Sequence, residues 1–447
     1  GGTQRAFEKG IDNLRDEESK SPRYVTLPTP DLEKIIVTPK QIEKLWDDAE
    51  VELGVQSSHY QTVRSESNQS LQKFISDSRG TVNHMVQQFQ MKQAADSDKR
   101  TDVAKTGILD TTTMINYRWS EDIFLKNEIH ADGKSHGIVM FLDWSSSMRG
   151  IIKDTVEQLI ILVEFCKRAG IPYEVYAFSS HVCPVLCTTD EDGHEVYPKQ
   201  FIKEGNDCDA HNFTLYNFLS SKMNPQQFKT ALSNLYCKVG NDSMCYGPRC
   251  LSLGCTPLNE AVLCAMNIVP QFQKDHGVQI VNTTFLTDGE GHGMLGYESG
   301  GIVIRDKKTK RTYKLGNTRR GKETDALLRM LKDKTGCTTI GIRLHDSHQL
   351  KHLRYTFWGE FTEATNKSFE NACRSYKQNK FCTIEGSGYD EMFIVQGNLK
   401  VEFDGLDGLE DDASMTRIKN AFIKGNSSKK SSRVVAGRII DIFCETH

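Results

Sequence analysis

Oxygen-bearing side chains occur in three short segments that lie at the ends of apolar runs or at the start of a helical stretch. The first segment follows the apolar run 137–142, the second precedes the helical stretch 258–268, and the third ends the largely apolar run 278–286. The five candidate ligands are Asp143, Ser145, Ser147, Thr256 and Asp288. Two carboxylates and three hydroxyls offer oxygen ligands only, which is the preference of hard divalent cations.

These residue types predict a site for Mg²⁺, with Mn²⁺ or Ca²⁺ as alternatives. Mg²⁺ takes six oxygens in an octahedron and keeps several waters. Two carboxylates leave room for another anionic ligand, so an Asp or Glu from a partner protein is expected to complete the shell. The alternative interpretation is a serine-rich turn beside two aspartates that happen to end strands.

The order of the predicted elements indicates how the three segments would meet. Strands are expected at 137–143, 173–179, 278–287, 338–344 and 391–396, and helices at 150–168, 215–222, 225–236, 258–268 and 325–334. This alternation predicts an α/β fold with a doubly wound, mostly parallel sheet. Such sheets bind ligands outside the carboxyl ends of their strands, where the candidate ligands fall.

The chain of 447 residues is long enough for two or three domains. We expect a mostly helical N-terminal region with an extended arm over residues 1–106, an α/β domain over 107–400, and a helical tail over 401–447. Insertions are expected near 183–210 and 291–316, the second as a hairpin. Within the first region, helices are expected at 41–53 and 70–95, followed by a polar linker at 96–106.

Composition and missing motifs narrow the classes of function. The formal net charge of −3 argues neither for nor against a nucleic-acid partner. No stretch approaches the roughly 18 apolar residues of a membrane span. No Gly-x4-Gly-Lys-Ser/Thr motif occurs, so ATP hydrolysis by this chain is not expected. Ser145 and Ser147 lack the Gly-x-Ser-x-Gly elbow of serine hydrolases, and no catalytic residue is assigned.

Thirteen cysteines, an odd number, fit reduced thiols in a cytoplasm better than a disulfide framework. One group has spacings that a zinc site could use: Cys183, Cys187, Cys208 and His211. The alternative is that these are unrelated thiols in an inserted loop, since neither half has the tight Cys-x2-Cys spacing of zinc ribbons.

Several motifs resemble one family. They are Gly-Ile-Leu-Asp at 107–110, Ser-Met-Arg-Gly at 147–150, Leu-Ser-Ser-Lys-Met at 219–223, Phe-Leu-Thr-Asp-Gly-Glu at 285–290, and Ile-Gly-Ile at 340–342 with His-Asp at 345–346. With them, the stretch 107–353 resembles the von Willebrand factor A (VWA) half of the CobT-type subunit of aerobic cobaltochelatase. It is more similar still to CobT-like VWA proteins of large tailed bacteriophages.

The resemblance implies that the five oxygen ligands form a metal-ion-dependent adhesion site. It also implies a partner, an AAA+ ATPase of the CobS/MoxR kind, in a chelatase-like or remodelling complex in the cytoplasm, which is the host cytoplasm for a phage-encoded chain. The chain lacks the family's long acidic segment, so the metal site transfers better than the chelatase reaction. The alternative is a structural or adhesive protein of a phage particle that uses the same site for subunit contacts.

Overall fold

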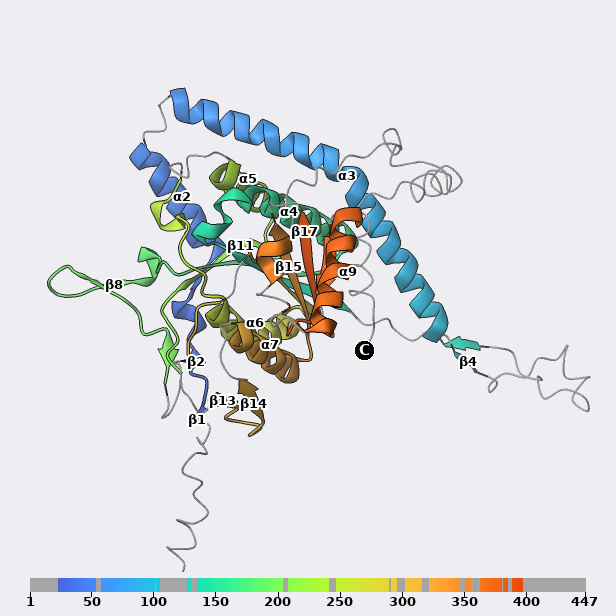
Figure 1. Cartoon of the computed structure of the whole chain (residues 1–447). Coiled ribbons are helices and arrows are strands. Elements are labelled where there is room, and N and C mark those ends of the chain that lie inside the picture. The colour runs from blue at the N-terminus through green and yellow to red at the C-terminus, as the bar shows by residue number, and fades with distance from the viewer. Residues whose placement is uncertain are drawn as a thin grey trace, which may run out of the picture.

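The computed structural model describes residues 23–53, 58–100, 102–104, 127–129, 135–203, 208–240, 247–288, 291–295, 302–315, 321–345, 350–354, 358, 362–379, 381–384 and 388–396. Its centre is an eight-stranded, mostly parallel sheet (Figure 1). In spatial order the strands are β16 (Phe381–Ile384), β17 (Glu391–Gln396), β15 (Thr338–His345), β12 (Ile280–Leu286), β6 (His136–Asp143), β7 (Tyr173–Ser179), β11 (Thr214–Ser220) and β3 (Ile36–Val37). Strands β17, β15, β12, β6 and β7 run parallel, whereas β11 and β16 are antiparallel to their neighbours β7 and β17.

The central strands are apolar on both faces because helices cover both. In β6, Ile138, Met140 and Leu142 point into one hydrophobic core, and Val139 and Phe141 point into the other. This period of two follows from the pleat of a strand. Continuous apolar runs are typical of parallel strands that are buried on both sides.

One face of the sheet packs against α3 (Ser58–Arg100), α4 (Ile152–Ala169) and α5 (Pro225–Gly240), and the other against α6 (Leu258–His276) and α7 (Gly321–Thr335). Three of these helices end at a glycine in the left-handed conformation, Gly170 after α4, Gly277 after α6 and Gly336 after α7. Glycine adopts that conformation without a steric penalty, which lets the chain turn back into the next strand.

The remaining elements border this core. Helix α2 (Pro39–Leu53) packs on the β11 side, and α9 (Glu363–Asn379) packs on β16. The other strands are β1 (Arg23–Val25), β2 (Thr29–Pro30), β4 (Asp102–Ala104), β5 (Asn127–Ile129), β8 (Thr188–Thr189), β9 (Glu195–Val196), β10 (Phe201–Ile202), β13 (Ile302–Arg305) and β14 (Thr312–Leu315). Figure 1 shows the C-terminal part of α3 extending beyond the sheet. No helix among the described residues is both long and apolar enough to cross a membrane.

Several predicted elements occur as expected. The strands at 173–179 and 391–396 have the predicted bounds, and β13 and β14 form the hairpin predicted within 291–316. The N-terminal region supplies β3, which pairs with β11 at the edge of the main sheet, and β1, which pairs with β13.

Two predictions are wrong. Of the residues 215–222, predicted as a helix, 215–220 lie in strand β11, which pairs antiparallel with β7, and 221–222 form a turn. The pairing wins because Leu215, Tyr216 and Leu219 are buried between helices on both faces, a tertiary context that helical propensity does not contain. The linker predicted at 96–106 is also wrong at its start, since α3 continues to Arg100. The motif at 107–110 and the predicted tail helices lie outside the described residues.

Phe141 tests how far the sheet depends on its central aromatic stack. Its ring is fully buried and stacks on Tyr176 and Phe285, with centroid distances of 5.6 and 5.0 Å. Phe141→Ala is expected to lower the free energy of unfolding by about 3–5 kcal/mol. Tyr197→Ala, at a ring that is 59% exposed, is the matched control and should change it little. Equal losses in urea unfolding would contradict this account of the core.

Candidate metal centre

The loop after β6 is joined to the segment before α6 by backbone hydrogen bonds. Ser146 N donates to the Gly254 carbonyl at 2.8 Å, and Gly254 N donates to the Trp144 carbonyl at 3.1 Å. A side chain at Gly254 would collide with Ser179 and Ser180, with hydroxyl oxygens 2.8 and 2.7 Å from an added Cβ. Glycine therefore permits the close approach of this segment to the end of β7, beside the Asp143 loop.

Trp144 anchors this loop to the hydrophobic core. The indole is fully buried, donates from Nε1 to the Leu251 carbonyl at 2.9 Å, and packs against Phe218 at a centroid distance of 5.2 Å. Trp144, which lies between the predicted ligands Asp143 and Ser145, thus points into the core. The side chains of these two neighbours therefore project to the opposite side of the chain.

The third segment arrives beside the first because β12 pairs with β6. Leu286 lies opposite Leu142, which places the residues after both strands at one edge of the sheet. Ser147 Oγ donates to Asp288 Oδ1 at 3.0 Å, and Ser145 Oγ lies 2.9 Å from Ser147 Oγ. Four of the five predicted ligands therefore lie together, with Asp143 directly preceding this chain of contacts.

Asp143 is the most unusual group of the cluster. It is fully buried, and Oδ2 accepts a hydrogen bond from Thr287 Oγ1 at 2.6 Å, whereas Oδ1 has no hydrogen-bond partner among the described residues. Burial, the largest cause, and the charge of Asp288 together raise the pKa of this carboxyl to about 7, although hydrogen bonds from Thr287 and Ser145 lower it. A carboxylate in this setting lacks a counter-charge, and a divalent cation supplies one.

Thr256 is brought to the same edge through its backbone. Cys255 N donates to Ser180 Oγ at 2.8 Å, and the Thr256 carbonyl accepts from His292 N at 3.3 Å. Thr256 itself is buried, directly before the first turn of α6. The fold thus places the fifth predicted ligand between the Asp143 loop and the segment after Asp288.

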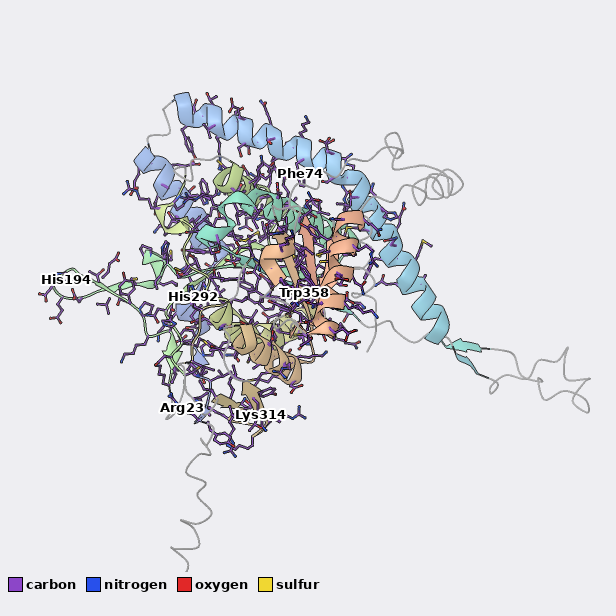
Figure 2. The ribbon with its side chains drawn as sticks, in the orientation of Figure 1. Arg23, Phe74, His194, His292, Lys314 and Trp358 are labelled. Atoms are coloured by element: carbon purple, nitrogen blue, oxygen red, sulfur yellow. The ribbon has the colours of Figure 1, made fainter. Side chains whose placement is uncertain are left out.

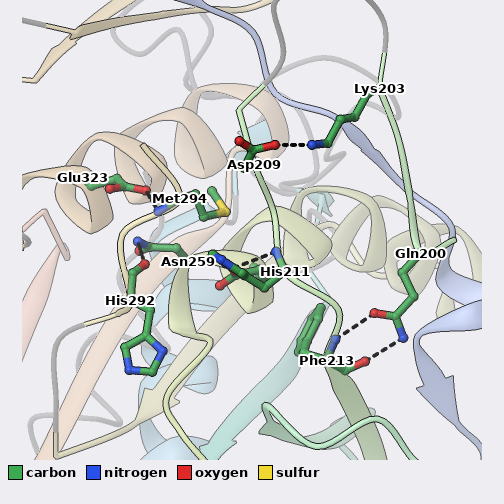
Figure 3. A network of polar contacts seen from close by, with 10 residues as sticks. Gln200, Lys203, Asp209, His211, Phe213, Asn259, His292, Met294 and Glu323 are labelled. Carbon is green, nitrogen blue, oxygen red and sulfur yellow. Dashed lines mark hydrogen bonds and ion pairs between the residues drawn. The ribbon is translucent and has the colours of Figure 1, made fainter. Parts of the chain in front are cut away.

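A polar network that the sequence did not predict supports this side of the site (Figure 3). Asn259 Nδ2 donates to the His292 carbonyl at 2.7 Å, and Asn259 Oδ1 accepts from Thr324 Oγ1 at 2.7 Å. Glu323 accepts from Met294 N at 2.7 Å, and burial raises its pKa to about 7. These bonds hold the loop after Asp288 against α6 and α7. In the sequence, the only signal for this network is that Asn259 lies three residues after Thr256.

The four residues considered for zinc do not come together. Cys183 belongs to the core on one face of the sheet and Cys208 to the core on the other. His211 pairs through Nδ1 with Glu260 at 3.1 Å. The Cys183 thiol instead has a hydrogen bond with Cys250, which lowers the pKa of Cys183 to about 7.

No group of three or more His, Cys, Asp or Glu side chains is arranged to hold a metal within the described part of the chain. The hydroxyl-rich centre at Asp143 has a different composition, with two carboxylates and three hydroxyls. Its donors are neutral or anionic oxygens throughout, so the residues present fit a hard cation such as Mg²⁺ and not a thiolate-preferring one.

Comparisons with known proteins give little. No protein-family model matches the chain, and no curated protein matches it. Among solved structures, a pilus adhesin, SpaC from Lactobacillus rhamnosus GG in an open conformation, aligns over 56% of this chain and 31% of its own, with 14% identity and a TM-score of 0.27. The match thus spans under a third of the adhesin, and a TM-score this low supports no argument about function.

Magnesium should stabilise the protein in a pH-dependent way. Asp143 keeps its proton up to about pH 7 when folded but loses it near its ordinary pKa of 3.8 when unfolded. Without the ion, ionising Asp143 therefore lowers the free energy of unfolding as the pH rises through this window. Mg²⁺ replaces the proton, so its increase of Tm should be larger at about pH 8 than at about pH 5.

The variant Asp143→Asn separates this effect from general ion binding. It should raise Tm at about pH 8 in EDTA, because no buried charge forms, and it should abolish the response to Mg²⁺. Asp190→Asn in the β8–β9 hairpin removes the same charge far from the site and should respond like the unmodified protein; Figure 2 shows the neighbouring His194 well away from the core. A full Mg²⁺ response in Asp143→Asn would rule out the proposed ligand.

Proposed function

We propose that this chain is a non-catalytic, VWA-type subunit that uses a metal-ion-dependent adhesion site to bind an acidic residue of a partner protein. The observation that carries the proposal is the Asp143 carboxylate, which is buried beside two serine hydroxyls and Asp288 and whose Oδ1 has no hydrogen-bond partner within the described part of the chain. An unsatisfied buried carboxylate is costly, and a cation at the neighbouring hydroxyls would remove that cost.

The topology of the sheet supports this class. Numbered along the chain from β6, the strands β6, β7, β11, β12, β15 and β17 stand in the spatial order 3-2-1-4-5-6. This is the order of a doubly wound, Rossmann-like sheet, in which ligands bind where the strand order reverses. The reversal falls between β6 and β12, the two strands that precede Asp143 and Asp288.

The proposed roles follow from the chemistry of each side chain. Asp143, Ser145, Ser147, Thr256 and Asp288 would hold Mg²⁺, or Mn²⁺ or Ca²⁺ in its place. When bound, the ion supplies a positive charge with an exchangeable coordination position. Asp143 is held by Thr287, and Ser147 by Asp288, so the protein presents these oxygens in a fixed arrangement to an incoming carboxylate.

The proposed partner is an AAA+ ATPase of the CobS/MoxR kind, in a chelatase-like or remodelling complex in the cytoplasm. This part rests on the family resemblance and on the missing phosphate-binding loop, which leaves ATP turnover to another subunit. The same site could instead hold a neighbouring subunit in a phage particle, and the experiment below separates the two.

Binding should depend on both the ion and the carboxylate. The purified chain, mixed with a MoxR-type ATPase from the same genome, should associate in Mg²⁺ but at least about tenfold more weakly in EDTA, and Asp143→Ala should weaken binding equally. Asp190→Asn should bind normally. Association that survives both Asp143→Ala and EDTA would exclude the metal-bridged contact.

The alternative predicts a different location. Quantitative mass spectrometry of purified virions from the same genome, if the chain is phage-encoded, should detect it only in traces when it serves an ATPase. A stoichiometric amount in particles, together with no Mg²⁺-dependent binding to the ATPase, would favour the structural role.

A further inference from the structure

A second candidate site lies beside the outer strand β11, near the amino ends of the parallel strands, and is independent of the metal centre. A cavity of about 500 Å³ is enclosed between α2, the outer part of β11, α5 and the end of α6. The cavity exists because the edge strand β3 pairs only with Leu215 and Tyr216. Among the described residues, the rest of β11 therefore has a neighbouring strand on its β7 side only. A volume of this size accommodates a small organic molecule.

The cavity wall contains a buried carboxylate, Glu174, which is 6% exposed. Asn217 Nδ2 donates to Glu174 Oε2 at 2.9 Å, and Ser220 Oγ donates to Oε1 at 2.7 Å. Both donors are neutral. The charge of Lys222, in the same wall, favours the ionised form of Glu174, but its ammonium pairs with Asp275 at 3.1 Å. Among the described residues, no cation forms an ion pair with Glu174 directly.

The backbone is arranged specifically to build this carboxylate site. Asn217 and Ser220 are three residues apart, a spacing that points side chains to opposite faces of a regular strand. The pairing of β11 with β7 shifts register between Asn217 and Leu219, and the extra residue returns both side chains to the face of Glu174. Bulges of this kind re-aim side chains and are over-represented next to active sites.

A second group in the wall also lacks a hydrogen-bond donor. Oδ1 of Asn217 is buried and has no partner among the described residues, although Nδ2 of the same amide bonds Glu174. Buried polar groups are nearly always satisfied, so such an atom calls for a missing donor. The aromatic side chains of Trp46, Phe218 and Phe272 contribute apolar surface to the same cavity.

From the cavity, the unpaired carboxylate and the bulge that builds it, we infer that this chain has a binding site for a small organic cation, an amine attached to an aromatic or apolar body. The ammonium bonds Glu174 and supplies the donor that Asn217 Oδ1 lacks, and the apolar body occupies the aromatic part of the cavity. Such a charge-assisted hydrogen bond is the strong kind in a protected site.

This site is separate from the metal centre. Glu174 pairs with Val139 and Asp143 pairs with Phe178, so four residues of strand, about 13 Å, lie between them. Binding of an amine here neither requires Mg²⁺ nor involves any of the five metal ligands. Failure of the metal-bridged contact would therefore leave this inference untouched, and the reverse also holds.

Calorimetric titration of the full chain in EDTA with tryptamine, phenethylamine and hexylamine tests the inference. At least one of the three should bind saturably with one site, and its uncharged counterpart, such as tryptophol for tryptamine, should bind at least about tenfold more weakly. Glu174→Gln keeps the size of the side chain but removes its charge and one acceptor oxygen, and it should cause a similar tenfold loss. Asp190→Asn, which removes one charge from the exposed hairpin, should leave binding unchanged.

A second variant guards against misfolding as the cause of lost binding. Ala231→Phe fills the cavity from α5 and leaves Glu174 in place, so it should abolish amine binding while the far-ultraviolet circular dichroism and the Mg²⁺ response persist. The inference is overturned if none of the three amines binds saturably below about 5 mM, or if a bound amine tolerates both Glu174→Gln and Ala231→Phe.

Discussion

The buried carboxylate of Asp143 is the interaction on which this end of the molecule depends. It lies at the last position of the central strand β6, fully enclosed, with one oxygen held by Thr287 and the other without a partner among the described residues. A strand that is apolar for six residues and then ends in a buried acid makes sense only if the acid is neutralised, by a proton or by a cation. The neighbouring oxygens of Ser145, Ser147 and Asp288 are of the kind that hard divalent cations bind.

Backbone contacts, more than side chains, position the rest of this centre. The Gly254 segment joins the Asp143 loop by two main-chain hydrogen bonds, and Asp288 arrives through the register of β12 on β6. Residues more than 100 positions apart are thereby held together by a sheet edge and one close glycine contact. Loops held this rigidly lose little freedom on binding, which is the advantage of building a recognition site on them.

The sequence could predict this edge but not its support. Asp143, Ser145 and Ser147 follow an unmistakable buried strand, and Asp288 ends another, so strand patterning alone brings them to one edge. The Asn259–Glu323 network escaped because its members are ordinary helix residues whose partners, His292 and Met294, lie in a loop without periodicity. The zinc hypothesis relied on spacing along the chain, whereas Cys183 and Cys208 lie on opposite faces of the sheet.

Strand β11, which was predicted as a helix, shows why the cavity beside Glu174 could not be predicted from the sequence. Its residues have helix-compatible spacing, and only pairing with β7 extends them; the register shift at Asn217 then turns two polar side chains toward Glu174. A helix over the same residues would have scattered these three groups. Because the bulge is a property of the pairing and not of either strand, a polar site of this kind depends on tertiary structure throughout.

The same sheet thus contains a buried carboxyl group near each end of its parallel strands, Asp143 at their carboxyl ends and Glu174 at their amino ends. The short β3 leaves the outer side of β11 to be covered by α2, and the cavity beside Glu174 lies there, away from the strand ends that hold Asp143.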